Sequence, residues 1–112
     1  MLRVKLEKPT GLKHCWILLT QGKFAIIDRE HLQLVNGFRW VAVKWHRKYY
    51  AYSYFRLDGT RSRIAMHRLI AETPQGDFTH HFNHNSLDNR SGNLLNMTNR
   101  DHMQLHGVRV WT

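Results

Sequence analysis

Cysteine, acidic side chains and long apolar runs are all scarce in this sequence. Cys15 is the only cysteine among the 112 residues, so a disulfide or a cysteine-type zinc site within one chain is excluded, and a reducing compartment is expected. The most apolar run, residues 15–20, is far too short to span a bilayer. Residues 1–9 lack the apolar stretch of a signal peptide. These absences predict a soluble, cytoplasmic protein.

The balance of charge is strongly basic. Lys and Arg number 17 against 8 Asp and Glu, which gives a net charge of +9, so the expected partner is polyanionic. A membrane-binding protein would place basic residues on an amphipathic helix, whereas here they fall mostly in strand-like, aromatic-rich sequence. This pattern favours nucleic acid over a membrane surface as the expected partner. A length of 112 residues with 42% hydrophobic content suits one compact domain, or two small modules that share a core.

The first half of the chain has the pattern of antiparallel strands. Alternating and apolar runs predict strands at residues 16–20, 23–27, 40–45, 49–56 and 61–66. The pair Gln21-Gly22 predicts a tight turn, and Asp58-Gly59 is a strong hairpin signal. Asp28 is expected to cap a short helix that ends at Asn36-Gly37. The sequence therefore predicts an N-terminal antiparallel sheet with one short helix.

Basic residues are concentrated in the last three of these strands and just after them. Asp58 is the only acidic residue between positions 39 and 68, and the Arg and Lys residues there are Arg39, Lys44, Arg47, Lys48, Arg56, Arg61, Arg63 and Arg68. A sheet rich in Arg, Lys, Trp and Tyr is suited to contact with a phosphate backbone. The alternative is a solvated basic face above an aromatic core. Because neutralising acids are nearly absent, we favour contact with nucleic acid.

The C-terminal part is rich in histidine. Five histidines fall within 27 residues: His80, His81, His84, His102 and His106. Imidazoles are costly to bury, and they combine metal ligation with proton transfer near neutral pH. A site with chemical function is therefore a better explanation of this stretch than packing.

The spacing of these histidines fits a strand, a loop, a second strand and a helix. Residues 78–83 and 94–97 predict the strands, so His80 and His81 would point to opposite sides. Thr98 and Asp101 have the spacing of a capping box, and Gly107 suits a helix C-terminus. His102 and His106, four residues apart, would lie on one helix face, as in metal sites. Taken alone, that pair is better explained as two exposed surface histidines, and the preceding segment is what favours a metal site.

These motifs resemble the HNH endonuclease family. The matching segments are His80-His81-Phe82-Asn83, then Leu87-Asp88-Asn89-Arg90-Ser91-Gly92-Asn93-Leu94, then Thr98 to His102. The chain upstream is also similar to small phage HNH proteins, at Leu19-Thr20-Gln21-Gly22-Lys23, Ile27-Asp28, Trp40 and Met66-His67-Arg68-Leu69-Ile70. The resemblance implies an α+β fold in which an N-terminal antiparallel β-sheet module, residues 1–65, packs on a C-terminal ββα-metal (HNH) unit, residues 66–112.

The resemblance also implies roles for individual residues. His81 would be the general base, and Asn93 the amide that ties the loop and helps to hold that histidine. His80 and His102 would be metal ligands, and with His106 they are similar to the three-histidine metal site of colicin-type nucleases. Many phage members have an acid in place of His80 and Asn in place of His102. The imidazole set suits zinc, nickel, cobalt or manganese better than an all-oxygen site would, with magnesium as a further candidate for the one divalent ion.

The function implied by the resemblance is metal-dependent hydrolysis of DNA by a protein encoded by a phage or mobile element. One site cuts one strand, so double-strand cleavage would need a homodimer or two successive nicks. Arg90 and Arg100 are candidates for phosphate binding, or ordinary surface arginines. His84 is expected to fill the loop, and His67 to pack or hydrogen-bond between the modules. The alternatives are a non-catalytic nucleic-acid-binding protein with a structural histidine-metal site, and a nuclease that acts on RNA or on any nucleic acid.

Overall fold

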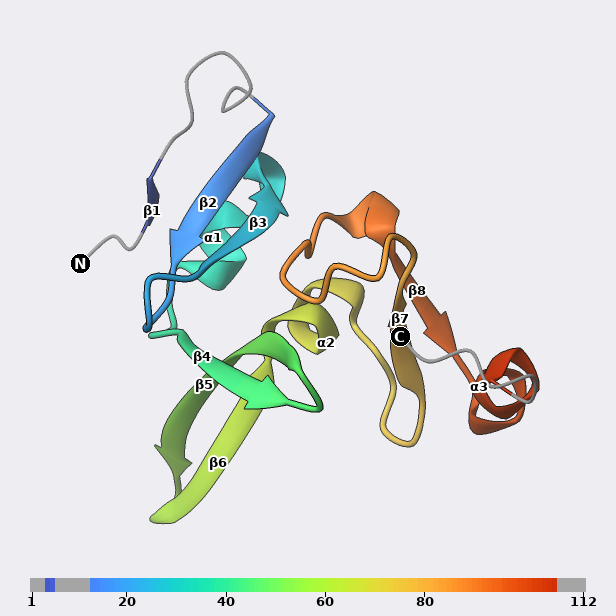
Figure 1. Cartoon of the computed structure of the whole chain (residues 1–112). Helices are drawn as coiled ribbons and strands as arrows, with labels where there is room; N and C mark the ends of the chain where they lie inside the picture. The colour runs from blue at the N-terminus through green and yellow to red at the C-terminus, as the bar shows by residue number, and fades with distance from the viewer. Residues whose placement is uncertain (1–3, 6–12, 107–112) are drawn as a thin grey trace.

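The chain has an α+β fold of three small antiparallel sheets and a few short helices (Figure 1). The computed structural model describes residues 4–5 and 13–106, with side chains for 13–101 and Met103. The sheets are β1 (Val4–Lys5), β2 (His14–Leu18) and β3 (Phe24–Asp28); β4 (Val41–Trp45), β5 (Lys48–Leu57) and β6 (Thr60–Ala65); and β7 (Phe78–His81) with β8 (Leu94–Met97). The helices are α1 (Leu32–Val35), α2 (Met66–Ala71) and α3 (Asn99–His106). The predicted α+β class is confirmed.

Two of the hairpins follow from their turn residues. The β2–β3 turn has Gln21 at φ 61° and Gly22 at φ 69°, and the β5–β6 turn has Asp58 at φ 51° and Gly59 at φ 78°. Two successive left-handed residues are typical of the tight turns that match the twist of antiparallel strands. The strands predicted on both sides of each turn are therefore confirmed.

One apolar cluster joins the first sheet to the helices. Its buried members include Cys15 and Ile17 of β2, Ala25 and Ile27 of β3, Val35 of α1, Trp40, and Met66 and Ile70 of α2. Alternate residues of β2 and β3 face this cluster, as the period of a strand requires. The Trp40 indole donates a hydrogen bond to the Val35 carbonyl at 2.9 Å, so this large side chain is buried without an unsatisfied N–H. The division at residue 65 stays a prediction.

The helix predicted after Asp28 is present, but Asp28 does not cap it. A 3-10 turn (Arg29–His31) leads into α1, and the Asp28 side chain makes no capping hydrogen bond. Its carboxylate oxygen Oδ2 instead accepts hydrogen bonds from the backbone N–H of Ser91, at 2.7 Å, and from the Ser91 hydroxyl, at 2.9 Å. The predicted cap is wrong because a partner far along the chain takes the carboxylate.

The third sheet and α3 follow the predicted order. β7 and β8 are antiparallel, with His80 opposite Leu95 and His81 opposite Leu94. Thr98 Oγ1 accepts a hydrogen bond from the Asp101 backbone N–H at 3.1 Å, as expected from the capping-box spacing. Gly107 lies outside the described residues. Figure 1 shows α2 between the second sheet and the β7–β8 pair, and within the described ranges no helix has the length and apolarity needed to cross a membrane.

Candidate functional site

His81 lies at the end of β7 and is held by an amide from the following loop. It is buried, at 5% exposure, and its Nε2 is 2.9 Å from Asn89 Oδ1. An amide oxygen can only accept a hydrogen bond, so this contact assigns the proton to Nε2 and the lone pair to Nδ1. Sequence reasoning did not single out Asn89, although it belongs to the Leu87-Asp88-Asn89-Arg90 motif.

The surroundings of His81 favour its neutral form. Burial is the largest influence and lowers the pKa of His81 below its ordinary value of 6.5, and the charge of Lys48 acts in the same direction. The hydrogen bond to Asn89 and the charge of Asp88 oppose this shift without cancelling it. A neutral imidazole is the form that can accept a proton.

His67 of α2 packs against His81. The two ring centroids are 5.2 Å apart, and the Tyr50 ring lies 5.8 Å from His67 and 6.4 Å from His81. Burial, followed by the nearby His81 and Arg68, lowers the pKa of His67 to about 3. Its Nδ1 is buried and has no hydrogen-bond partner within the described part of the chain. The sequence predicted packing at His67 and missed its contact with His81, because no local spacing relates the two residues.

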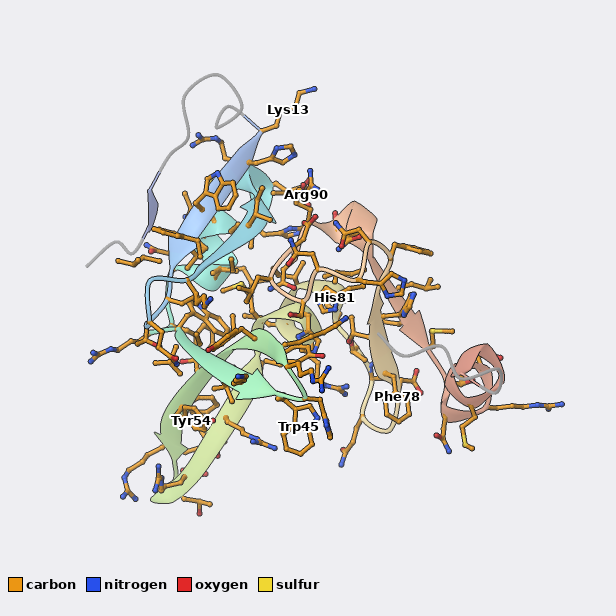
Figure 2. All side chains as sticks on the ribbon, in the orientation of Figure 1. Lys13, Trp45, Tyr54, Phe78, His81 and Arg90 are labelled. Carbon is orange, nitrogen blue, oxygen red and sulfur yellow. The ribbon has the colours of Figure 1, made fainter. Side chains whose placement is uncertain are left out.

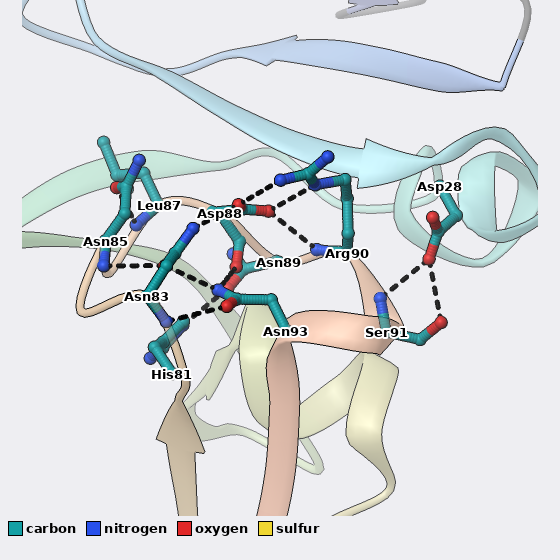
Figure 3. Close-up of polar contacts among 10 residues, drawn as sticks. All are labelled: Asp28, His81, Asn83, Asn85, Leu87, Asp88, Asn89, Arg90, Ser91 and Asn93. Carbon is teal, nitrogen blue, oxygen red and sulfur yellow. Dashed lines mark hydrogen bonds and ion pairs between the residues drawn. The ribbon is translucent and has the colours of Figure 1, made fainter.

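Asn93 closes the loop that follows β7 (Figure 3). Its Nδ2 donates to Asn83 Oδ1 at 2.9 Å and to the Asp88 carbonyl at 2.8 Å. Its Oδ1 accepts from the Asn83 backbone N–H at 2.9 Å, and its own carbonyl accepts from the Phe82 N–H at 2.9 Å. Asn93 therefore ties both ends of the loop together, while the direct contact with His81 comes from Asn89.

An ion pair between the partly exposed Arg90 and the buried Asp88 braces the same loop. Arg90 donates to both carboxylate oxygens of Asp88, at 2.8 and 2.6 Å, and Asn83 Nδ2 donates to Asp88 Oδ2 at 2.7 Å. Burial alone would raise the pKa of Asp88, but the hydrogen bonds from Arg90 and Asn83 outweigh it and lower that pKa. The Arg90 charge, expected to be available to a phosphate or solvent, is balanced within the loop.

The first and second sheets both hold this loop. The Ile26 N–H donates to the Leu87 carbonyl at 2.9 Å, and the Asn89 N–H donates to the Ile26 carbonyl at 2.8 Å. In the second sheet, Lys48 Nζ donates to the His84 carbonyl at 3.0 Å, and the Ser86 hydroxyl donates to the Tyr49 carbonyl. The position of Asn89, and through it of His81, therefore depends on residues 26–49.

The expected metal ligands are only partly within the described side chains. His80 of β7 is buried, and the His84 ring centroid lies 5.8 Å from its own. His102 and His106 belong to α3, but their side chains lie outside the described residues. Among the side chains that are described, no group of three or more His, Cys, Asp or Glu is placed to hold a metal. The three-histidine site stays a prediction.

Several of the basic residues proposed for DNA contact have local partners. Arg56 donates to the Gly59 carbonyl at 3.1 Å. Arg68 donates to the Asp77 carbonyl at 2.8 Å and to the Pro74 carbonyl at 3.1 Å. These acceptors are uncharged, so the positive charge is not neutralised by them. The side chains of Arg39, Lys44, Arg47, Arg61 and Arg100 are exposed, and the second sheet supplies most of the exposed basic positions.

Comparison with models of protein families, with curated proteins and with solved structures finds no match to this chain. The functional reading therefore depends on the motifs and on the geometry around His81.

Proposed function

We propose that the protein is a metal-dependent HNH endonuclease that hydrolyses phosphodiester bonds of DNA, with His81 as the general base. The observation that supports it most directly is the buried His81, whose Nε2 contacts Asn89 in a loop closed by Asn93 and whose pKa is lowered by burial. The order of β7, the loop, β8 and α3 is also that of a ββα unit. The net charge of +9 suits a DNA partner.

His81 would take the proton of the attacking water on Nδ1. Its lowered pKa keeps this nitrogen unprotonated near neutral pH, as a general base requires. The hydrogen bond from Nε2–H to Asn89 Oδ1 fixes the orientation of the ring, and it stabilises the imidazolium formed when Nδ1 accepts the proton. The nearby carboxylate of Asp88 acts in the same direction.

His80, His102 and His106 would hold one divalent ion, either zinc, manganese, nickel, cobalt or magnesium. Neutral imidazole is a good ligand for the first four of these, and His80 is already fixed on β7 beside the start of β8. When bound, such an ion stabilises the charge that develops on the phosphate and the leaving oxygen. Separate residues would therefore bind the ion and accept the proton.

One observation favours the alternative, a nucleic-acid-binding protein with a structural histidine-metal site. His81 is only 5% exposed and packs between Tyr50, His67 and Asn89, so it could serve the fold instead of a reaction. A structural site would still need His80, His102 and His106, but it would not need His81 as a proton acceptor.

Plasmid cleavage across a series of divalent metals separates the two functions. The wild type is expected to give nicked or linear DNA, and His81→Ala to lose at least about 100-fold in rate, the scale of a missing general base. DNA binding should survive in the variant, and added imidazole should restore part of the activity. Gln33→Ala, an exposed change on α1 away from the loop, is the control. Inactivity of the wild type with every metal would overturn the proposal.

A further inference from the structure

A groove lies between the second sheet, α2 and β7. It has a volume of about 480 Å³, within the range of ligand-binding clefts. Its lining includes four aromatic residues, Trp45, Tyr50, Tyr52 and Phe78, and two arginines, Arg63 and Arg68. None of the residues that line it is acidic.

Two of the four aromatic side chains of the groove are exposed to solvent, and the other two, Tyr50 and Tyr52, are half-buried. Trp45, at the end of β4, is 64% exposed, and Phe78, at the start of β7, is 38% exposed. Figure 2 labels both, on facing sides of the space between the second sheet and β7. Large apolar side chains that are exposed side by side often mark a binding site. Rings of this kind stack on the faces of unpaired bases.

The two arginines add positive charge along the same groove. The Arg63 guanidinium lies 5.3 Å from the centroid of the Tyr52 ring. Arg68 is oriented by the Pro74 and Asp77 carbonyls, which are uncharged acceptors. Both cations therefore retain charge that a phosphate can neutralise.

We propose that this groove binds a single strand of DNA, with bases stacked on Trp45 and its aromatic neighbours and phosphates against Arg63 and Arg68. A stacked duplex hides the faces of its bases, so aromatic rings of this kind select unpaired nucleotides. The role of this groove in cleavage rests on the proposed endonuclease function. His67 lines the groove, and its ring centroid is 5.2 Å from that of His81, so a strand bound there passes beside the proposed base.

Fluorescence anisotropy with a labelled DNA oligonucleotide, without added divalent metal, tests the groove directly. Trp45→Ala should weaken binding of the single strand by about tenfold, because a base loses its stacking partner. Arg63→Gln should weaken it to a similar extent, because a phosphate loses a positively charged partner. Trp45→Phe should stay within about threefold of the wild type because it keeps a stacking ring. Binding of the matching duplex should change much less.

Two control variants lie outside the groove. Leu57→Ala removes an exposed apolar side chain at the end of β5, and Lys13→Gln removes one positive charge before β2. Neither should alter binding of the single strand. Circular dichroism and thermal melting verify that the exposed groove substitutions leave the fold intact.

Unchanged single-strand affinity in folded Trp45→Ala and Arg63→Gln would overturn the inference, and so would equal weakening of duplex binding. Tighter binding of an RNA strand of the same sequence would overturn the assignment to DNA. Plasmid cleavage is scored separately. If the groove variants bind single-stranded DNA normally while the protein cleaves plasmid DNA, the endonuclease proposal stands and the groove proposal fails. If binding depends on the groove residues but the wild type does not cleave, the groove proposal stands and the endonuclease proposal fails.

Discussion

The Asp28 carboxylate accepts hydrogen bonds from both the backbone N–H and the hydroxyl of Ser91, 63 positions along the chain. The same strand contributes Ile26, whose backbone pairs with Leu87 and Asn89. The N-terminal sheet is therefore a structural support of the loop that positions His81, in addition to any part it has in binding.

Removal of the Asp28 carboxylate should destabilise the protein. We expect Asp28→Ala to lower the free energy of unfolding by about 1–1.5 kcal/mol, because two hydrogen bonds are lost at an exposed site where water replaces the carboxylate as acceptor. Ser91→Ala loses only the hydroxyl contact and should cost less, about 0.5–1 kcal/mol. Urea denaturation of both variants and of the double variant measures the coupling between the two residues. Additive effects would mean that the contact between the Asp28 carboxylate and the Ser91 hydroxyl contributes nothing.

Stability should fall in acid because of His67. Its pKa is lowered to about 3 in the folded protein, whereas an unfolded histidine has its ordinary value near 6.5. The unfolded state therefore binds more protons between these two values. The contribution of neutral His67 is complete above about pH 6.5 and is lost progressively as the pH falls toward 3.

Urea denaturation at pH 7 and pH 5 tests this shift. His67→Gln carries no proton at either pH, so the wild type should lose about 2 kcal/mol more than the variant over this interval. His46→Gln, a change at the exposed β4–β5 turn, should behave as the wild type. The same acid loss in wild type and His67→Gln would contradict the assignment.

The rate of DNA cleavage should depend on Asn89. Asn89→Leu removes the acceptor of His81 Nε2–H, so the ring loses its fixed orientation, and we expect cleavage to fall at least about tenfold. Asn89→Asp keeps an acceptor and should retain more of the rate. Initial rates on plasmid DNA, compared with Gln33→Ala on α1 as a remote amide control, measure the effect. Full activity of Asn89→Leu would show that the contact has no part in the reaction.

Local signals in the sequence account for the secondary structure and for one part of the site. Gly22 and the Asp58-Gly59 pair located two turns, and Thr98 located the start of α3. Asp28 shows the limit of such local rules. The sequence around Asp28 predicts a helix cap, but in the folded protein its carboxylate binds the distant Ser91 instead. The contact could not be predicted because Asp28 and Ser91 are far apart in the sequence.

The same reason explains what was missed around His81. The motif identifies His81 in the sequence, but its neighbours His67 and Asn89 belong to α2 and to the loop. His67 depends on the packing of α2 between two sheets. Asn89 depends on the fold of a polar loop whose side chains form several alternative hydrogen bonds. Neither position has a periodicity that could identify it in advance.

The parallel bridge between Ile26 and Asp88 has a consequence for the order of folding. The three hairpin-linked strands of the second sheet are close in sequence and can form early, whereas this bridge closes a long stretch of chain and carries a larger entropic cost. The loop around Asn89 should therefore become ordered late, after the β2–β3 hairpin exists. On a growing chain, His81 would reach its final surroundings only once Asn89 and Leu94, which contact it, had emerged from the ribosome.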